Sequence, residues 1–251
     1  MLHLLKRHPF PVTAFFRQSL VLTYAFPSAL LEPLLPPGLV LDTYGDYGFL
    51  AIAMVQTERL RPSFLPAVFG RACFLSGYRI FARLGNRDSS LRGLRILRSD
   101  TDDPWMVRAG NLLTHYGYRL CQAELRESPG EIEWSIRTPR QEADLQVIAH
   151  IGDGPTPLPA GSPFVNAKDA RRFAGPLPYT FDYEAETHSI IRIQGIRQEW
   201  NPKPVAVEVA TNTFLTQEPF RRATPILANA FHVHEIPYRW QRGTRTPLEP
   251  R

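Results

Sequence analysis

Lysine and cysteine are both scarce in this chain of 251 residues. Lysine occurs only at Lys6, Lys168 and Lys203, so a mechanism that needs an amine nucleophile has few candidates. The two cysteines, Cys73 and Cys121, are too few for a disulfide framework and cannot by themselves complete a four-ligand zinc site. We expect both to be buried, unreactive thiols of a reducing compartment, and we predict a cytoplasmic location.

Long apolar runs and nucleotide-binding motifs are also absent. No window approaches the ~18 apolar residues of a membrane-spanning helix. Residues 1–10 are interrupted by Lys6 and Arg7 and lack the apolar stretch of a secretory signal. Neither glycine-rich phosphate-binding pattern occurs, so we expect no bound dinucleotide or triphosphate. We therefore predict no membrane partner and no cofactor.

The charge balance is moderately basic, with a formal net charge of +5. The arginines are scattered among acidic residues rather than gathered in runs, which argues against a nucleic-acid partner. An alternative reading has this basic surface engage a protein or nucleic-acid partner, with the fold as a scaffold only. Homodimers are the commonest oligomers, so a homo-oligomer is compatible with the sequence, but no residue pattern selects one.

The 24 prolines and 16 glycines are spread along the whole chain, which is typical of many short strands joined by turns. A nearly continuous apolar run at Gly48–Val55 predicts a strand buried on both faces. Leucines at helical spacing after Pro27 predict a short helix that ends at Pro36. We expect further strands at 19–24, 74–84, 91–99, 112–127, 131–138, 145–151, 189–197, 205–214 and 230–238, turns at 85–88 and 128–130, a loop at 62–70 and a helix at 166–173. These elements predict a single, mainly β domain over 1–251 with a few short helices.

Few residues offer catalytic chemistry. No GxSxG nucleophile motif is present. His115, His188 and Asp100 are candidates for a general acid or base, although each could equally be a hydrogen-bonded packing residue. His232 and His234 would share one face of a strand but lack a third ligand, so we predict no metal site.

Arg17 is the most suggestive single position. It lies between Phe15-Phe16 and a predicted strand, in an apolar context where an arginine is costly unless it is paired. Its planar guanidinium could bind the carboxylate of a ligand. The alternative is an exposed arginine at the start of a strand.

The segment Phe16–Asp42, with Arg17, Tyr24 and a proline-containing turn at 35–39, resembles the N-terminal region of acetoacetate decarboxylase and its relatives. The tail from Ile226 resembles the closing strand of that family. More closely, the chain is similar to an uncharacterised conserved domain grouped with this superfamily. The resemblance implies a single-domain, mainly antiparallel β-barrel with a closed interior cavity. In the decarboxylase of this superfamily, a lysine inside that cavity forms a Schiff base with a β-keto acid.

The sequence departs from that family at the lysine. Where the resemblance places the lysine pair, this chain has Arg98, Ser99 and Asp100, none of which can form an imine. Lys168 lies in a polar predicted helix and Lys203 in a predicted turn. The resemblance therefore carries over the fold and Arg17, but not the decarboxylation chemistry.

Two functional hypotheses follow for the barrel interior. In the first, the protein binds a small organic acid, such as a keto acid, without catalysing a reaction. Its ligand-binding residues would be Arg17, Arg79, Ser99, Asp100 and Thr101. In the second, it is a lysine-independent lyase, hydratase or hydrolase acting on a related carboxylic acid, with His115, His188 or Asp100 as acid or base. A cavity that holds one of these three beside the binding arginine would favour the enzyme.

Overall fold

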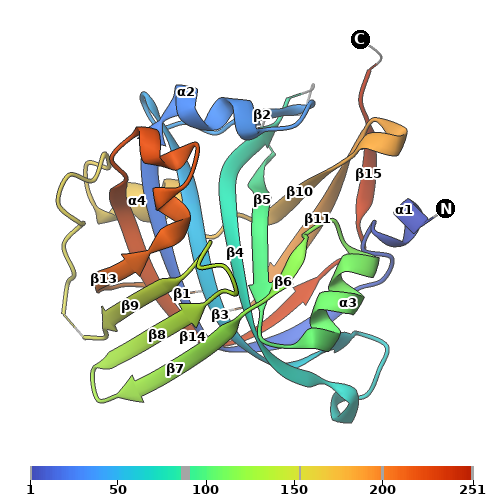
Figure 1. Ribbon diagram of the computed structural model, residues 1–251, viewed down its shortest axis with the longest axis horizontal. Helices are drawn as coiled ribbons and strands as arrows, with labels where there is room; N and C mark the ends of the chain where they lie inside the picture. The colour runs from blue at the N-terminus through green and yellow to red at the C-terminus, as the bar shows by residue number, and fades with distance from the viewer. Residues whose placement is uncertain (1, 86–90, 153, 199–200, 250–251) are drawn as a thin grey trace.

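A closed ring of long strands dominates the structure (Figure 1). The computed structural model describes residues 2–85, 91–152, 154–198 and 201–249. The strands pair in the order β14-β1-β3-β4-β5-β10-β11, and β11 pairs back with β14, so the sheet closes into a barrel. Their bounds are Val12–Pro27 (β1), Tyr47–Pro62 (β3), Arg71–Leu84 (β4), Arg92–Thr101 (β5), Tyr179–Glu184 (β10), Ser189–Arg197 (β11) and Ile226–Trp240 (β14).

Neighbouring strands of the ring are antiparallel except for β5 and β10, which run parallel where Tyr179 faces Gly93. The prediction of a mainly β, largely antiparallel barrel is confirmed. The remaining short elements are α1 (Leu2–Leu5), α2 (Ser28–Leu31), β2 (Leu39–Leu41), α3 (Pro104–Leu113), β6 (Tyr118–Leu120), α4 (Ala167–Ala174), β12 (Lys203–Pro204) and β15 (Thr244–Pro247), together with short 3-10 turns.

Strand β3 shows how the barrel obtains both an outer and an inner apolar face. Because side chains alternate along a strand, Leu50, Ile52 and Met54 point outward into one hydrophobic cluster. Ala51 and Ala53 point inward with Phe49 into another. The apolar run at 48–55 is thus buried on both sides, as predicted. The alanines leave room inside that larger side chains would fill.

A second sheet packs on the outer face of β1, β3 and β4. Its strands are β7 (Gln122–Ser128), β8 (Glu131–Arg137), β9 (Leu145–His150) and β13 (Ala206–Asn212), in the order β13-β9-β8-β7. Period-two alternation buries Ile132, Trp134 and Ile136 of β8 against the barrel. The Trp134 ring lies 5.0 Å from that of Phe74, centroid to centroid. The second sheet therefore covers the outward apolar residues of the barrel.

The two ends of the barrel are covered differently. Aromatic rings of Tyr44, Phe49, Phe81, Phe164 and Phe173 pack together at the end near α4, with centroids 5.1–6.2 Å apart. The opposite end is covered by α3 and the segment after it, which lie where β5 and β10 part. The α3 end is therefore covered by a helix and its following segment rather than by a packed aromatic cluster.

Most predicted elements are confirmed, but one predicted strand begins too early and strand β10 was not predicted. The hairpin across 128–130 forms as β7 and β8, with Gly130 at φ +80° in the turn. The strand predicted from 112 is wrong in its first residues, because α3 runs to Leu113. Asp103 caps that helix by accepting a hydrogen bond from the Trp105 amide at 2.9 Å. Residues 86–88 of the turn predicted at 85–88 lie outside the described residues.

Truncating Trp134 tests the packing between the two sheets. We expect Trp134→Ala to lower the free energy of unfolding by about 3–5 kcal/mol, because it leaves a cavity in a fully buried interface. Urea unfolding followed by circular dichroism measures the change. Arg126→Ala, at an exposed position of β7, should stay within about 0.5 kcal/mol of the wild type. Equal, small losses in both variants would contradict the packing described.

Candidate functional site

The barrel encloses a cavity of about 140 Å³, which we call the inner cavity. Its wall combines small or apolar residues with polar residues from six strands of the ring and from the segment after α3. The polar lining residues are Ser19, Ser76, Arg79, Ser99, Tyr116, Tyr118, Thr180, Arg197 and Tyr238. The volume is below the roughly 300–1,000 Å³ of drug-sized sites, so it suits a small group.

Arg79 is the central polar residue of this cavity. It lies on the inward face of β4, two residues from Gly77 and two from Phe81, which line the same cavity. Its Nε atom is buried and has no hydrogen-bond partner. Burial lowers the pKa of the guanidinium, and the nearby hydroxyls of Tyr238, Tyr116 and Tyr118 partly offset this. Within the described part of the chain, no carboxylate pairs with Arg79.

Arg197 brings a second guanidinium into the cavity from the end of β11. Its Nη2 atom donates a 2.6 Å hydrogen bond to the carbonyl of Pro176, and its side chain also hydrogen-bonds to Tyr238. These contacts hold the Arg197 side chain at the wall of the cavity. Two cations share one small cavity, and no acidic residue occurs among the described residues that line it. Such an arrangement attracts an anion.

Two glycines make the space that these polar groups occupy. A Cβ atom at Gly195 would lie 1.9 Å from the Tyr238 hydroxyl, so only glycine allows this tyrosine to reach across β11. A Cβ atom at Gly77 would lie 3.3 Å from Arg79 Nε. Gly195 is thus required by the close approach of Tyr238, whereas a side chain at Gly77 would crowd the Arg79 guanidinium.

The tyrosine hydroxyls remain protonated at neutral pH. Burial raises the pKa of Tyr116, Tyr118 and Tyr238 above the ordinary value of 10.0. Each can therefore donate a hydrogen bond to an anion held by the arginines. The cavity combines two fixed positive charges with neutral donors, which is the chemistry that recognises a carboxylate.

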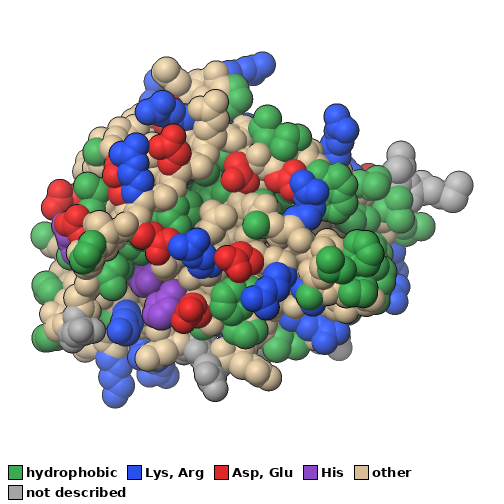
Figure 2. Space-filling view, turned by 90° about the horizontal axis from the view of Figure 1, so that it is seen from below, with side chains coloured by type: hydrophobic (Ala, Val, Ile, Leu, Met, Phe, Trp, Pro, Cys, Tyr) green, Lys and Arg blue, Asp and Glu red, His purple; other side chains and the backbone are tan. Residues whose placement is uncertain are grey.

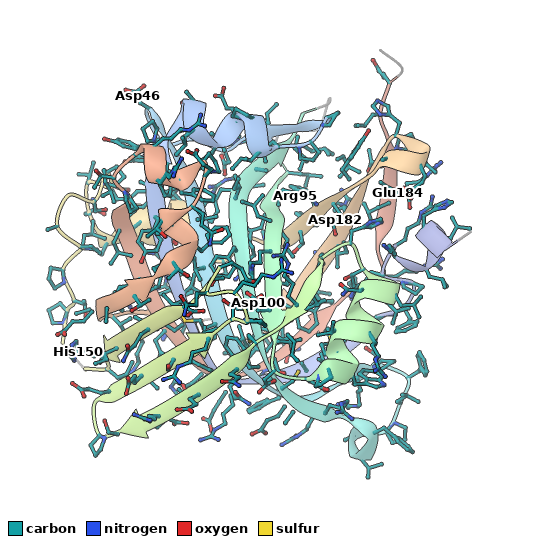
Figure 3. All side chains as sticks on the ribbon, in the orientation of Figure 1. Asp46, Arg95, Asp100, His150, Asp182 and Glu184 are labelled. Carbon is teal, nitrogen blue, oxygen red and sulfur yellow. The ribbon has the colours of Figure 1, made fainter. Side chains whose placement is uncertain are left out.

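The five predicted ligand-binding residues divide between the inside and the outside of the barrel. Arg79 and Ser99 line the inner cavity. Thr101 is buried and accepts a 3.3 Å hydrogen bond from the backbone N–H of Asp103. Asp100 faces outward toward the second sheet, where Arg98 pairs with it at 2.7 Å (Figure 3). Burial raises the pKa of Asp100, and Arg98 offsets part of this rise.

Arg17 lies on the outer surface. The pairing of β1 with β3 shifts register between Phe16 and Gln18, so Arg17 occupies an irregularity of the strand. Its side chain is 51% exposed and its Nη2 atom forms a 2.6 Å ion pair with Glu127 of the second sheet. Phe16, not Arg17, lines the inner cavity. Of the two apolar neighbours that suggested a buried arginine, Phe16 is buried and Phe15 is partly buried, but Arg17 itself is exposed.

The three predicted acid–base residues also lie away from the inner cavity. His188 occupies a left-handed turn at φ 44° and contacts the Tyr183 hydroxyl at 2.9 Å. His115 lies near Asp182; burial lowers the pKa of His115, and Asp182 offsets part of this shift. Arg95 donates a hydrogen bond to Asp182 (Figure 3). None of His115, His188 and Asp100 is among the described lining residues.

Several lining residues escaped sequence reasoning. They come from three segments that are distant in the chain and meet only when the barrel closes: Tyr116 with Tyr118, Arg197, and Tyr238. Alternation along 189–197 could have placed Arg197 on the face of Gly195, but it does not show which face is inside.

The metal and thiol predictions concern other parts of the barrel. No cluster of three metal-ligating side chains occurs in the described ranges. Cys73 and Cys121 are both buried and free. Burial raises the pKa of the Cys73 thiol to about 11, so it remains a thiol at neutral pH. Among the helices that the structure describes, none has the length and apolar character to cross a membrane.

An ion pair ties the N-terminal segment to the rim of the barrel at the α3 end. Arg7 donates three hydrogen bonds to Glu184 of β10, the shortest at 2.6 Å from its Nη2 atom. These bonds lower the pKa of the fully buried Glu184 carboxyl to about 2. The ion pair holds residues 6–9 against the barrel.

Solved structures share this fold over nearly the whole chain. An acetoacetate decarboxylase-like enzyme from Sphingomonas wittichii RW1 is 14% identical, with a TM-score of 0.61, and the match covers 95% of this chain and 92% of that one. The enduracididine biosynthesis enzyme MppR, in complex with pyruvate, is 10% identical with a TM-score of 0.63, over 94% and 90% of the two chains. Acetoacetate decarboxylase from Legionella pneumophila is 12% identical with a TM-score of 0.61, over 95% and 88%.

The barrel is therefore of the acetoacetate decarboxylase-like class, as the sequence resemblance implied. Within this class, the model of the DUF2071 family, described as an uncharacterized conserved protein, matches residues 13–242. The chain belongs to this family. No curated protein matches it.

Removing the Glu184 charge tests how much the ion pair between Arg7 and Glu184 stabilises the fold. The folded pKa of about 2 lies below the ordinary value of 4.5, so the ion pair contributes stability above about pH 5 that is lost as the pH falls from 4.5 toward 2. We expect Glu184→Gln to be less stable than the wild type at neutral pH, and the gap to shrink in acid. Urea midpoints between about pH 7 and pH 3 measure this; a gap independent of pH would contradict it.

Proposed function

We propose that the protein binds a small organic acid in the inner cavity, with Arg79 receiving the carboxylate. The observation that carries this proposal is a guanidinium enclosed in the barrel with no carboxylate of the described chain beside it. A buried charge without a partner is destabilising, and an anionic ligand relieves that cost. Arg197 and the tyrosine hydroxyls supply further donors around the same space.

The fold comparison is consistent with this class of ligand. MppR, whose barrel is similar, holds pyruvate in its solved structure. At 10% identity this likeness concerns the fold, so the support from the chemistry of the cavity is the stronger of the two.

We also propose that the protein forms no Schiff base and is not a decarboxylase of the lysine type. All three lysines fall within the described ranges, and none lines the inner cavity. Lys168 is exposed on α4, and Lys203 is exposed on β12. Ser99, at the position where the resemblance places the lysine pair, lines the cavity with a hydroxyl.

Binding is favoured over lysine-independent catalysis. The discriminating feature was an acid–base residue beside the binding arginine, and His115, His188 and Asp100 lie outside the described lining of the cavity. Asp100 is moreover paired with Arg98 at 2.7 Å and accepts a 3.3 Å hydrogen bond from Ser76. A reaction would need a different acid or base.

Substitution of Arg79 tests the binding site directly. At 100 times its dissociation constant, pyruvate or hexanoate should stabilise the wild type by about 2.7 kcal/mol, a rise of roughly 5–11 °C in Tm for a chain of this size. Arg79→Met should show no rise. Without ligand it should melt no lower than the wild type, because a buried charge has been removed.

Arg17→Ala is the matched control, since it removes an arginine outside the cavity. It should respond to each acid as the wild type does. If Arg79→Met gains as much stability as the wild type, or if no carboxylate shifts the wild type, the proposal is wrong.

Borohydride reduction tests the absence of an imine. After incubation with acetoacetate or pyruvate and sodium borohydride, the intact mass should remain unchanged, because no amine projects from the described cavity lining. The Legionella pneumophila acetoacetate decarboxylase serves as the positive control. A reduced adduct on Lys6, Lys168 or Lys203 would refute this part of the proposal.

A further inference from the structure

A second and larger cavity lies beside the inner one at the α3 end of the barrel. We call it the outer cavity; its volume is about 430 Å³. It lies between the N-terminal segment, the β3–β4 connection and α3, and its lining is largely apolar. Leu60, Leu65, Phe69, Met106, Ala109 and Leu113 represent that lining.

The two cavities share part of their wall. Leu75, Tyr116, Tyr118 and Trp240 line both. These four residues form the partition between a small, cationic space and a larger, apolar one. A molecule that spans the partition would meet two guanidinium groups at one end and a largely apolar surface at the other.

The outer cavity opens to solvent between two exposed aromatic residues. Phe69 and Trp105 line it and are 64% and 53% exposed. Hydrophobic side chains gather on the surface toward the right of Figure 2, on the side of the β3–β4 connection. The opposite end of the barrel is filled by the aromatic cluster around Phe49. The apolar side is therefore the accessible one.

The two arginines that line the outer cavity already have partners. Arg61 donates to the backbone carbonyls of Leu65 and Arg59 at 3.0 and 2.8 Å. Arg71 pairs with Asp103 at 2.7 Å. The pKa of His8 is lowered to about 4 by burial, so its ring is neutral. The arginine available to bind a carboxylate is therefore Arg79, on the other side of the partition.

We propose that the ligand is a monocarboxylic acid with an extended apolar chain. Its carboxylate lies at Arg79 in the inner cavity, and its chain passes between Tyr118 and Trp240 into the outer cavity. This inference rests on the proposed function and adds the chemical class of the ligand. This placement requires the side chains of the partition to rotate aside, and the apolar lining of the outer cavity then buries the methylene groups.

A series of straight-chain acids tests this class. Titration calorimetry with acetate, hexanoate and decanoate, below the concentration at which decanoate aggregates, should show affinity rising roughly threefold to fourfold for each added methylene. Decanol should bind far more weakly than decanoate, because it lacks the charge. Arg79→Met should abolish that difference.

Ala109→Trp fills the outer cavity from α3 and should weaken decanoate at least tenfold while leaving acetate unchanged. Leu112→Trp is the matched control, because Leu112 is exposed on the same helix and is not part of that lining. Circular dichroism and melting verify that each variant folds, and Ala109→Leu replaces Ala109→Trp if the latter does not.

The outcomes separate the two proposals. If short acids bind through Arg79 but affinity is independent of chain length, the apolar chain is wrong and the proposed function stands. If no acid of any length binds, the proposed function fails. Equal binding of decanol and decanoate, unaffected by Arg79→Met, would show a chain site unconnected to the inner cavity and overturn this inference.

Discussion

A guanidinium enclosed in a protein interior needs a counter-charge, and Arg79 has none within the described chain. The surrounding architecture maintains this condition. The ring of strands excludes bulk water, and Ala51, Ala53 and Gly77 keep space open around the side chain. Closure at the far end by packed aromatic rings limits the approach of solvent or of a partner carboxylate from that side.

The contrast with the other buried charges is informative. Asp42 is fully buried and accepts from both Arg83 and Arg92. Asp100, Asp182 and Glu184 are each paired with an arginine as well. Each of these four buried carboxylates therefore has an arginine as its partner. In the inner cavity, by contrast, Arg79 is buried and no carboxylate of the described residues pairs with it, which is why we propose an anionic ligand there.

The inner and outer cavities divide the recognition of such a ligand between charge and burial. The arginines and neutral tyrosine hydroxyls provide direction and charge, whereas the apolar lining beside α3 provides nonspecific burial. Tyr118 and Trp240 line both cavities, so one molecule that occupies both would contact these two side chains. The second sheet contributes indirectly, by covering the outward apolar faces of β1, β3 and β4.

Much of the fold was predictable because its signals are local. The apolar run at 48–55 and the hairpin turn at 128–130 specify their strands directly. Strand β10 was missed, since its inward residues Thr180, Asp182 and Glu184 are polar and mimic an exposed face. Arg17 was misplaced because sequence does not show the irregularity that turns it outward.

The candidate site was only partly predictable. Arg79 and Ser99 were named from their strands, and both line the inner cavity. Arg197 and Tyr238 could not be joined to them, because that contact depends on the closure of β11 onto β14. Long-range closure, rather than local pattern, creates the site.

A crystal structure of the protein with hexanoate tests the central claim most directly. The account predicts carboxylate density within about 3 Å of the Arg79 guanidinium, with the chain directed toward α3. Density elsewhere, or an inner cavity without the acid while Arg79 is paired with a carboxylate of the protein, would contradict it.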